Sequence, residues 1–323
     1  MAYRFEKSES IPEGVRRVVD EQLDWAARQL SKADDPVTAI HEARKSIKKV
    51  RGALRLLRPG LGAAYRAETS YFRGLGRKLS ELRDAAAIIE VFDQLREKHK
   101  ARSKHSDFHD IRSGLERDKR DTEEAANVET TIKETIAGLR AAKRRVENWP
   151  IPNGGFETIA PGLKASYRRG RRAGRRARKQ PAAENFHDFR KRVKEHWYHM
   201  RLLEALWTEA LKERERDLNN LETWLGDDHN LTVLREKITG KPASYGDDRH
   251  QQAFLSAASE EQKELQSKAL ALGQRLYEEK PRAFAAELAE LWQSWQAAPP
   301  VKRTPAKAAG RRTVIKKEKG AAA

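Results

Sequence analysis

The sequence has 323 residues, of which 66 are Lys or Arg and 48 are Asp or Glu, so its formal net charge is +18. The absence of cysteine excludes disulfide bonds and thiolate metal sites, and no run of about 18 apolar residues is present that would span a membrane. We therefore expect a soluble, cytoplasmic protein that attracts a polyanion, and DNA, RNA, an acidic membrane surface and inorganic polyanions are all compatible with its charge.

The composition favours an all-α fold. Charged residues make up 35% of the chain and hydrophobic residues 38%, a balance that suits long helices with narrow apolar sides. Ala, Leu, Glu, Lys and Arg, which favour helices, dominate nearly every segment, and alternating strand-like runs are hard to find. In chain order the first half predicts helices over residues 12–30, 39–59, 64–79 and 84–98, and a helical pattern continues over 108–148.

The segment NWPIPNGGF interrupts this pattern with prolines and glycines, which is typical of a boundary. Beyond it the helical pattern resumes to Leu221, passes a predicted turn at GDDHN and runs to Ile238, and a further helix pair fills residues 249–295. The chain is thus divided into a lead (1–11), a first helical repeat (12–148), a linker (149–160), a second helical repeat (161–296) and a disordered basic tail (297–323).

An internal repeat relates the two halves, because residues around His41 recur around His187 at one constant offset. The matching pairs are His41 and His187, Arg44 and Arg190, Lys45 and Lys191, Lys48 and Lys194, Arg55 and Arg201, Leu75 and Leu221, and Leu79 and Leu225. The preserved offset predicts a tandem duplication. We expect two similar bundles of about four helices or more each, related by a pseudo-twofold axis, with a basic central groove or pore.

The spacing of His41, Arg44, Lys48, Arg51 and Arg55 places them on one line of a helix, beside an apolar line that borders the core. A solvated helix face is the alternative, since Lys and Arg often lay their stems on apolar surface. Only one acid, at position 42, occurs within residues 41–58, so we expect that internal ion pairs do not neutralise this row. Like charges at this spacing repel, and a bound polyanion would relieve that repulsion.

A second basic run precedes the second copy of the repeat. Within residues 168–179, Arg168, Arg171, Arg172, Arg175 and Lys179 share one broad side of a predicted helix. We interpret this side as a further wall of the same anion site. The alternative is a disordered basic tract of the kind that directs nuclear import.

These motifs resemble the CHAD domain, the conserved histidine α-helical domain. The matching strings are IHEARKSIKKVRGALRLL, LGRKLSELRDAAAIIEVF, YRRGRRA, FHDFRKRVKEHWYHMRLLEAL and LETWLGDDHNLTVL, which extend over residues 12–295. The resemblance implies two four-helix bundles around an internal twofold, a basic surface or pore that binds inorganic polyphosphate, and association with polyphosphate granules. The sequence departs from strict equivalence of the two copies, because Trp197 stands where Arg51 stands in the first copy.

The predicted polyphosphate-binding residues combine the two basic rows with the arginine run. They are His41, Arg44, Lys45, Lys48, Arg51, Arg55, Arg168, Arg171, Arg172, Arg175, His187, Arg190, Lys191, Lys194 and Arg201. Phosphate oxygens suit Arg for paired contacts and Lys for mobile point charges. His41 and His187 either contact phosphate or hydrogen-bond to Asp84 and Asn230.

Two other functions compete with this interpretation. A metal-dependent phosphohydrolase could use the FHD strings at 108–110 and 186–188, but each basic row offers one histidine among cations that repel a metal. We therefore expect no enzyme activity and no cofactor. A general nucleic-acid-binding protein is the second alternative, although base stacking needs exposed aromatic side chains and most of those here fall on core-facing lines.

Overall fold

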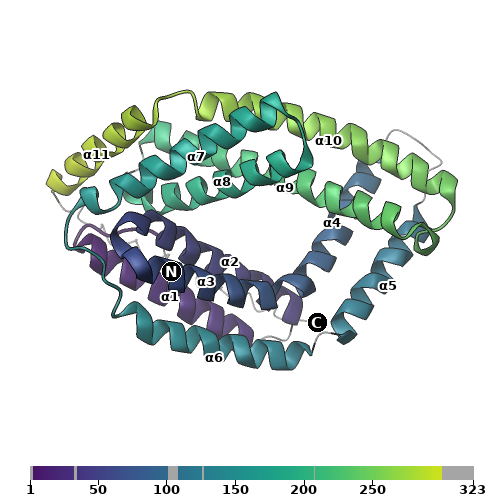
Figure 1. Cartoon of the computed structure of the whole chain (residues 1–323), viewed down its shortest axis with the longest axis horizontal. Helices are drawn as coiled ribbons and strands as arrows, with labels where there is room; N and C mark the ends of the chain where they lie inside the picture. The colour runs from purple at the N-terminus through teal and green to yellow at the C-terminus, as the bar shows by residue number, and fades with distance from the viewer. Residues whose placement is uncertain (1–2, 33–34, 101–107, 126, 207, 300–323) are drawn as a thin grey trace, which may run out of the picture.

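A computed structural model describes residues 3–32, 35–100, 108–125, 127–206 and 208–299 of the chain. Within these residues it contains only helices and no strand, which confirms the predicted all-α fold (Figure 1). The α-helices are α1 (Ile11–Ser31), α2 (Pro36–Leu56), α3 (Arg58–Lys78), α4 (Ser80–Lys100), α5 (His109–Ala125), α6 (Val128–Val146), α7 (Ala160–Lys179), α8 (Ala183–Leu202), α9 (Glu209–Gly240), α10 (Asp248–Leu276) and α11 (Pro281–Ala297). Three short 3₁₀ helices are η1 (Phe156–Thr158), η2 (Glu204–Leu206) and η3 (Pro242–Ser244).

Local signals set the starts of the first two helices. At α1, Ser10 and Glu13 form a capping box, in which the Ser10 amide donates to Glu13 Oε2 at 2.8 Å. At α2, Asp35 Oδ1 accepts from the Val37 amide at 3.0 Å, and Pro36 occupies the first turn, where its missing N–H costs nothing. These contacts confirm the predicted break before the first basic row.

The boundary after α2 differs from the prediction. The helix predicted over residues 39–59 ends earlier, because α2 ends at Leu56. Pro59 and Gly60 do not form a break between helices, because Pro59 lies in the first turn of α3. A kink at Gly62, with φ of 51°, then interrupts α3. Only glycine adopts this left-handed conformation without strain, which explains why the helical pattern of the sequence is regular only from Ala64 onward.

The predicted turn at GDDHN is wrong, since α9 runs through it without a break. The side chain of Asp228 is buried and accepts hydrogen bonds from Gln262 Nε2 at 3.2 Å and from Gln266 Nε2 at 2.7 Å, both on α10. Gly226 leaves room for Arg190, whose Nη2 lies 3.3 Å from the position of an added Cβ. Tertiary contacts therefore override the local preference of Gly and Asp for a turn.

The helices bury two hydrophobic cores. The larger one joins side chains of α1, α2, α3, α6, α7, α8, α11, the first half of α9 and the end of α10. The smaller one joins α4 and α5 to the second half of α9 and to α10. Its centre is Phe254, which stacks on Phe92 with ring centroids 5.1 Å apart and meets the edge of Phe108 at 5.2 Å. Figure 1 shows α4 and α5 beside the far ends of α9 and α10.

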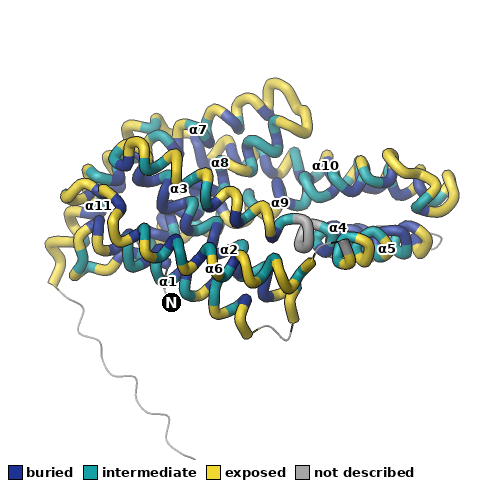
Figure 2. Tube along the Cα trace, turned by 60° about the horizontal axis from the view of Figure 1, so that its bottom comes forward, coloured by how far each residue is buried: buried dark blue, intermediate teal, exposed yellow. Residues whose placement is uncertain are grey.

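Both cores include helices from each predicted repeat, so the repeats share their interiors. The segment predicted as a linker, residues 149–160, contains η1 and buries Trp149, Ile151 and Phe156. Figure 2 shows buried positions running through the contacts between the two halves. The pseudo-twofold relation between the repeats stays a prediction, and the predicted basic tail from residue 300 onward lies outside the described residues.

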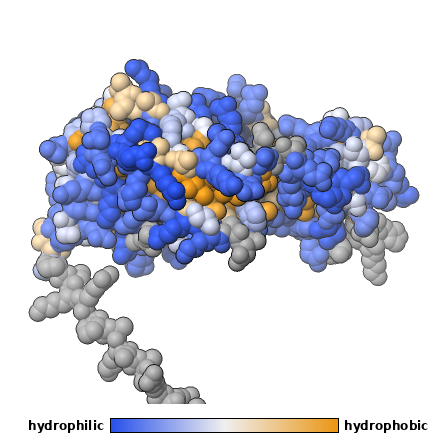
Figure 3. Space-filling model, turned by 90° about the horizontal axis from the view of Figure 1, so that it is seen from below, coloured by the Kyte–Doolittle hydropathy of each residue, from blue (hydrophilic) through white to orange (hydrophobic). Residues whose placement is uncertain are grey.

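The surface of the protein is mostly hydrophilic. Figure 3 shows polar residues over most of the face seen from below, with apolar residues gathered near its centre. No helix among the described residues combines the length and the apolar composition that crossing a membrane requires.

Two glycines let helices of the two halves approach closely. An added Cβ at Gly52 of α2 would lie 3.1 Å from Tyr198 Cβ of α8, and one at Gly162 of α7 would lie 1.8 Å from Leu56 O. The Gly52 carbonyl also accepts a hydrogen bond from buried His199 Nε2 at 2.9 Å. These close approaches fix α2 against α7 and α8, which positions the two basic rows relative to each other.

We expect Gly162→Ala to destabilise the protein by about 1–3 kcal/mol or more, because the new methyl group must push α7 away from the α2 backbone. The matched control is Gly74→Ala, since a Cβ at Gly74 meets nothing within 4 Å. Alanine at that helical position should stabilise by about 0.5–1 kcal/mol. Urea unfolding of both variants checks this, and equal stabilities would contradict the close crossing of α2 and α7.

Candidate functional site

The basic rows of α2 and α8 border a shared cavity. In α2 the apolar line of Ile40, Ala43 and Ile47 is buried, as are Phe186 and Phe189 of α8, which confirms the predicted core-facing sides. The basic residues lie beside these lines on each helix and are half-buried or exposed. Burial of the apolar sides therefore turns the two basic edges toward the space between α2, α4, α8 and α9.

The first cavity has a volume of about 450 Å³. Its lining comes from four helices and is rich in cations. The residues are His41, Arg44 and Lys48 of α2; Ala87, Ile88 and Glu90 of α4; His187, Arg190, Lys191 and Lys194 of α8; and His229, Asn230 and Val233 of α9. Seven of the predicted site residues therefore meet here, from segments far apart in the sequence.

A second cavity of about 420 Å³ adjoins the first and shares Arg44, Lys48 and His187 with it. Its other lining residues are Ile47 and Arg51 of α2, Arg73, Gly76 and Arg77 of α3, and Ser80 of α4. Together the two spaces are called the central cavities below. Sequence reasoning missed Arg73 and Arg77, although their i,i+4 spacing on a predicted helix is the signal that identified the other rows.

The cations in the central cavities destabilise one another. Burial, together with Lys194, Arg44 and Arg190, lowers the pKa of Lys48 to about 7, against the opposing effect of Glu222. Burial also lowers the pKa of Lys194. A nearby anion would favour the charged form of Lys48, which burial and the neighbouring cations disfavour.

The acid that faces these cations is Glu222 of α9. Its Oε1 lies 2.5 Å from Lys194 Nζ and 3.6 Å from Arg190 Nε. Burial raises the pKa of Glu222, but Lys194, Arg190 and Lys48 lower it overall, so its carboxylate is ionised. Glu222 thus pairs with two cations of the α8 row. In the α2 row Arg55 pairs with Glu195 of α8, so the expectation that ion pairs do not neutralise that row is wrong at this residue, because it considered only acids of the same helix.

The two histidines of the rows both line the first cavity. The ring of His187 lies 4.2 Å from that of His229, centroid to centroid, and its Nδ1 is buried without a hydrogen-bond partner among the described residues. Burial and the nearby Lys191 and Arg190 lower the pKa of His187, so it is neutral at pH 7. The predicted partner of His41, Asp84, has a side chain outside the described ones.

The far ends of the two rows leave the central cavities. Arg55 Nε lies 3.6 Å from Oε2 of Glu195, which is buried and also pairs with Arg169 of α7. Arg201 instead lies over the ring of Trp197, 5.4 Å from its centroid. The far ends of the two rows therefore differ in structure as well as in sequence, because Trp197 replaces a cation in the second copy.

Lys45 also lies outside the cavity linings. It is exposed on α2 and its Nζ lies 2.9 Å from Glu42 Oε1, one turn away. Its counterpart Lys191 does line the first cavity, although it is exposed as well. The two copies of the repeat therefore use equivalent lysines differently.

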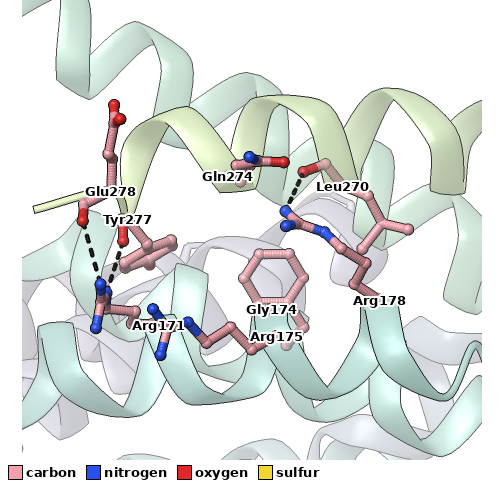
Figure 4. Close-up of a pocket in the computed structure, with 10 residues that line it drawn as sticks. Arg171, Gly174, Arg175, Arg178, Leu270, Gln274, Tyr277 and Glu278 are labelled. Atoms are coloured by element: carbon pink, nitrogen blue, oxygen red, sulfur yellow. Dashed lines mark hydrogen bonds between the residues drawn. The ribbon is translucent and has the colours of Figure 1, made fainter.

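The arginine run of α7 does not form a wall of the central cavities, which corrects the prediction. None of Arg168, Arg171, Arg172 and Arg175 lines either cavity. Arg171 and Arg175 line a separate cleft of about 280 Å³ against α10, which Figure 4 shows. There Arg171 Nε donates to Tyr277 O at 3.0 Å. The prediction failed because helical spacing shows which residues share a side, but not which neighbour that side faces.

The described residues hold one group of three possible metal ligands, which lies away from the central cavities. Asp110, Asp247 and His250 place ligand atoms within 4.8 Å of one another at the starts of α5 and α10. Asp247 already caps α10, where its Oδ1 accepts from the His250 amide at 2.9 Å. Neither His41 nor His187 belongs to this group, so the histidines of the rows are not joined to a metal-ligating cluster.

The low pKa of Lys48 has a consequence for stability that can be measured. From its folded pKa of about 7 up to the ordinary lysine value of about 10.4, the unfolded chain binds a proton that the folded chain does not. Stability should therefore rise with pH across this window, and below pH 7 the full penalty of a buried cation remains. We expect Lys48→Met to stabilise the protein at pH 7 and to reduce this rise.

Urea unfolding between pH 6 and pH 10 checks this prediction. Lys45→Met on the same helix is the matched control, because Lys45 is exposed and should change stability little. Lower stability of the Lys48→Met variant than of the unchanged protein at pH 7 would show that the ammonium group is compensated in the folded state.

Comparisons with known proteins identify the family of the chain and agree with its all-α fold. A family model described as CHAD domain matches residues 15–239, which include α2, α8 and nearly all of α9. The crystal structure of the CHAD domain from the plant Ricinus communis matches 93% of this chain and 94% of its own, with a TM-score of 0.52 and 14% sequence identity, which shows the fold alone. No curated protein matches. Because the family model covers more than half of the sequence, the chain belongs to the CHAD domain family.

Proposed function

We propose that this protein binds inorganic polyphosphate in the central cavities, associates with polyphosphate granules and catalyses no reaction of its own. The observation that carries the proposal is the convergence of Arg44 and Lys48 of α2 with Arg190 and Lys194 of α8 around one open cavity. Such a group of cations repels itself unless an anion of matching charge is present. The membership of the CHAD domain family supports the same ligand.

The shape of the site favours a linear anion. The two central cavities adjoin through Arg44, Lys48 and His187, and Arg51, Arg73 and Arg77 extend the row of cations along α2 and α3. Arg offers paired N–H donors to phosphate oxygens, and Lys adds point charges between them. A chain of phosphates can therefore contact successive cations from one cavity to the next.

The lining also favours a ligand without bases. Among the described residues, no Phe, Tyr or Trp lines either central cavity, and most aromatic side chains of α8 are buried in the core. Single-stranded nucleic acids gain much of their affinity from stacking on exposed aromatic rings. This composition supports polyphosphate over RNA or single-stranded DNA.

Binding would change the charges that line the cavities. A polyphosphate segment beside Lys48 raises its pKa from about 7, so the lysine takes up a proton as the ligand binds. The ligand must also compete with Glu222 for Lys194 and Arg190. The titration of Lys48 makes affinity fall as the pH rises through 7, because a neutral Lys48 contributes no attraction.

The acids near the central cavities do not form an arrangement typical of a hydrolase among the described residues. Hydrolysis of a phosphate chain generally uses a metal held by clustered carboxylates or histidines, or a base poised beside the attacking water. Glu222 is engaged by Lys194, and Glu90 is the carboxylate among the described residues that line the first cavity. The residues present are thus suited to holding the polymer.

Arg190→Gln tests the proposal directly. Loss of one charge-assisted hydrogen-bonding group should weaken polyphosphate binding by about 1.5–3 kcal/mol, roughly ten- to a hundredfold. It should also make the dependence of log affinity on log salt shallower, because about one fewer counterion is released per lost phosphate contact. Calorimetric titration at two salt concentrations measures both quantities.

Arg201→Gln is the control, because Arg201 lies against Trp197 outside the central cavities and its loss should leave affinity nearly unchanged. Competition with RNA and duplex DNA of equal total charge tests the class of ligand. If either nucleic acid displaces the protein as well as long polyphosphate does, the function is general polyanion binding. Equal losses of polyphosphate affinity in the two variants would contradict binding in the central cavities.

A further inference from the structure

The outward side of α7 carries a row of cations that the central cavities do not use. Its members are Lys164, Arg168, Arg172, Arg175 and Lys179, which follow three- and four-residue spacing and are all exposed. With a rise of 1.5 Å per residue, the row extends over about 22 Å. These five residues are called the α7 row below.

The other arginines of α7 have partners that the α7 row lacks. On one flank Arg169 pairs with Glu195, and Arg176 Nη1 lies 4.0 Å from Asp188 Oδ2, both acids of α8. On the other flank Arg171 donates to Tyr277 O, and Arg178 Nη2 donates to Leu270 O at 3.4 Å. These flanking residues attach α7 to α8 and α10, so each of them has a structural role.

For the α7 row the structure records no such role. Among the described residues, the side chains of its five members form no hydrogen bond or ion pair. The helix has no acid between Ala160 and Lys179, whereas other exposed helices pair their cations internally, as Lys133 does with Glu129 and Lys268 with Glu264. Like charges four residues apart repel each other on an exposed helix.

The α7 row lies on the side of the helix opposite its buried residues. Leu163, Tyr167, Ala173 and Ala177 point into the core, and the row occupies the reverse side. Figure 2 shows α7 at an edge of the molecule with its exposed positions turned away from α8. The row therefore cannot contribute to the central cavities, and it presents a separate basic surface.

The composition of this surface limits the class of partner that it can bind. No large apolar or aromatic side chain of α7 is exposed, so nothing there would insert into a membrane or stack on a base. A single straight row one helix wide fits one narrow anionic chain. The neighbouring cleft, which Arg175 lines together with Arg171 and Arg178, adjoins the row (Figure 4).

We propose that the α7 row is a second polyphosphate-binding surface, independent of the central cavities, so that one molecule holds two polyphosphate segments at once. This inference rests on the proposed function, because it assigns the same class of ligand to a second place. Its consequence is that the protein links separate polyphosphate chains, or distant parts of one chain, into a network.

Titration calorimetry of the full chain with a short polyphosphate of defined length, at low salt, tests the inference. The α7 variant Arg168→Gln/Arg172→Gln/Arg175→Gln should bind one short chain where the unchanged protein binds two. The central variant Arg44→Gln/Lys48→Met/Arg190→Gln should keep the other site. With long polyphosphate, light scattering should show large particles for the unchanged protein and a loss of them for either variant.

The matched control removes three exposed cations from α6, as Lys133→Gln/Arg140→Gln/Arg144→Gln, and should keep both sites. Circular dichroism confirms that each variant folds. Two sites in the α7 variant, or equal losses in the α7 and α6 variants, would overturn the inference while leaving the central site intact. Binding at the α7 row of duplex DNA but not of polyphosphate would also overturn it, and no polyphosphate binding by the unchanged protein would refute the proposed function itself.

Discussion

Buried apolar side chains hold α2 and α8 together although the basic edges of these helices repel each other. Each fully buried aliphatic or aromatic side chain contributes about 1.5–3 kcal/mol, and Ile40, Ile47, Phe186 and Phe189 are among many that are buried here. Repulsion between exposed neighbouring cations costs a few tenths of a kcal/mol per pair. The core can therefore impose an arrangement of charges that the charges alone would not adopt, and the lowered pKa of Lys48 records the remaining unfavourable energy.

Cations of one chemical type serve three purposes in this chain, and the partner decides which. Arg55 and Arg169 compensate buried Glu195, so they belong to the structure. Arg171 donates to a carbonyl at the end of α10 and fastens that helix to α7. Lys48 and Arg190 line a cavity whose described residues include more cations than acids. A net charge of +18 does not separate these purposes, whereas the position of each acid and carbonyl does.

Much of the fold was predictable from the sequence, because the residue pattern that indicates a helix lies within the helix itself. Spacing and composition predict the apolar and basic lines of α2 and α8, the break before α2 and the helix pair after residue 248. The continuity of α9 was not predictable, since Asp228 is held in a helix by glutamines of α10. Glu222 and the direction of the α7 row were missed for the same reason. A single-helix pattern identifies a side but not the neighbour across from it, and those neighbours come from distant parts of the chain.

The central claim is that the central cavities hold Lys48 in an unfavourable charge state that polyphosphate relieves. Its pKa can be followed by NMR of lysine side-chain carbons, with Lys48→Met used to assign the signal, in the absence and presence of saturating polyphosphate. The account predicts a pKa of about 7 for the free protein and a rise to well above 8 in the complex, since about one pKa unit corresponds to about 1.4 kcal/mol of interaction. A Lys48 pKa that polyphosphate leaves unchanged would contradict binding in the central cavities.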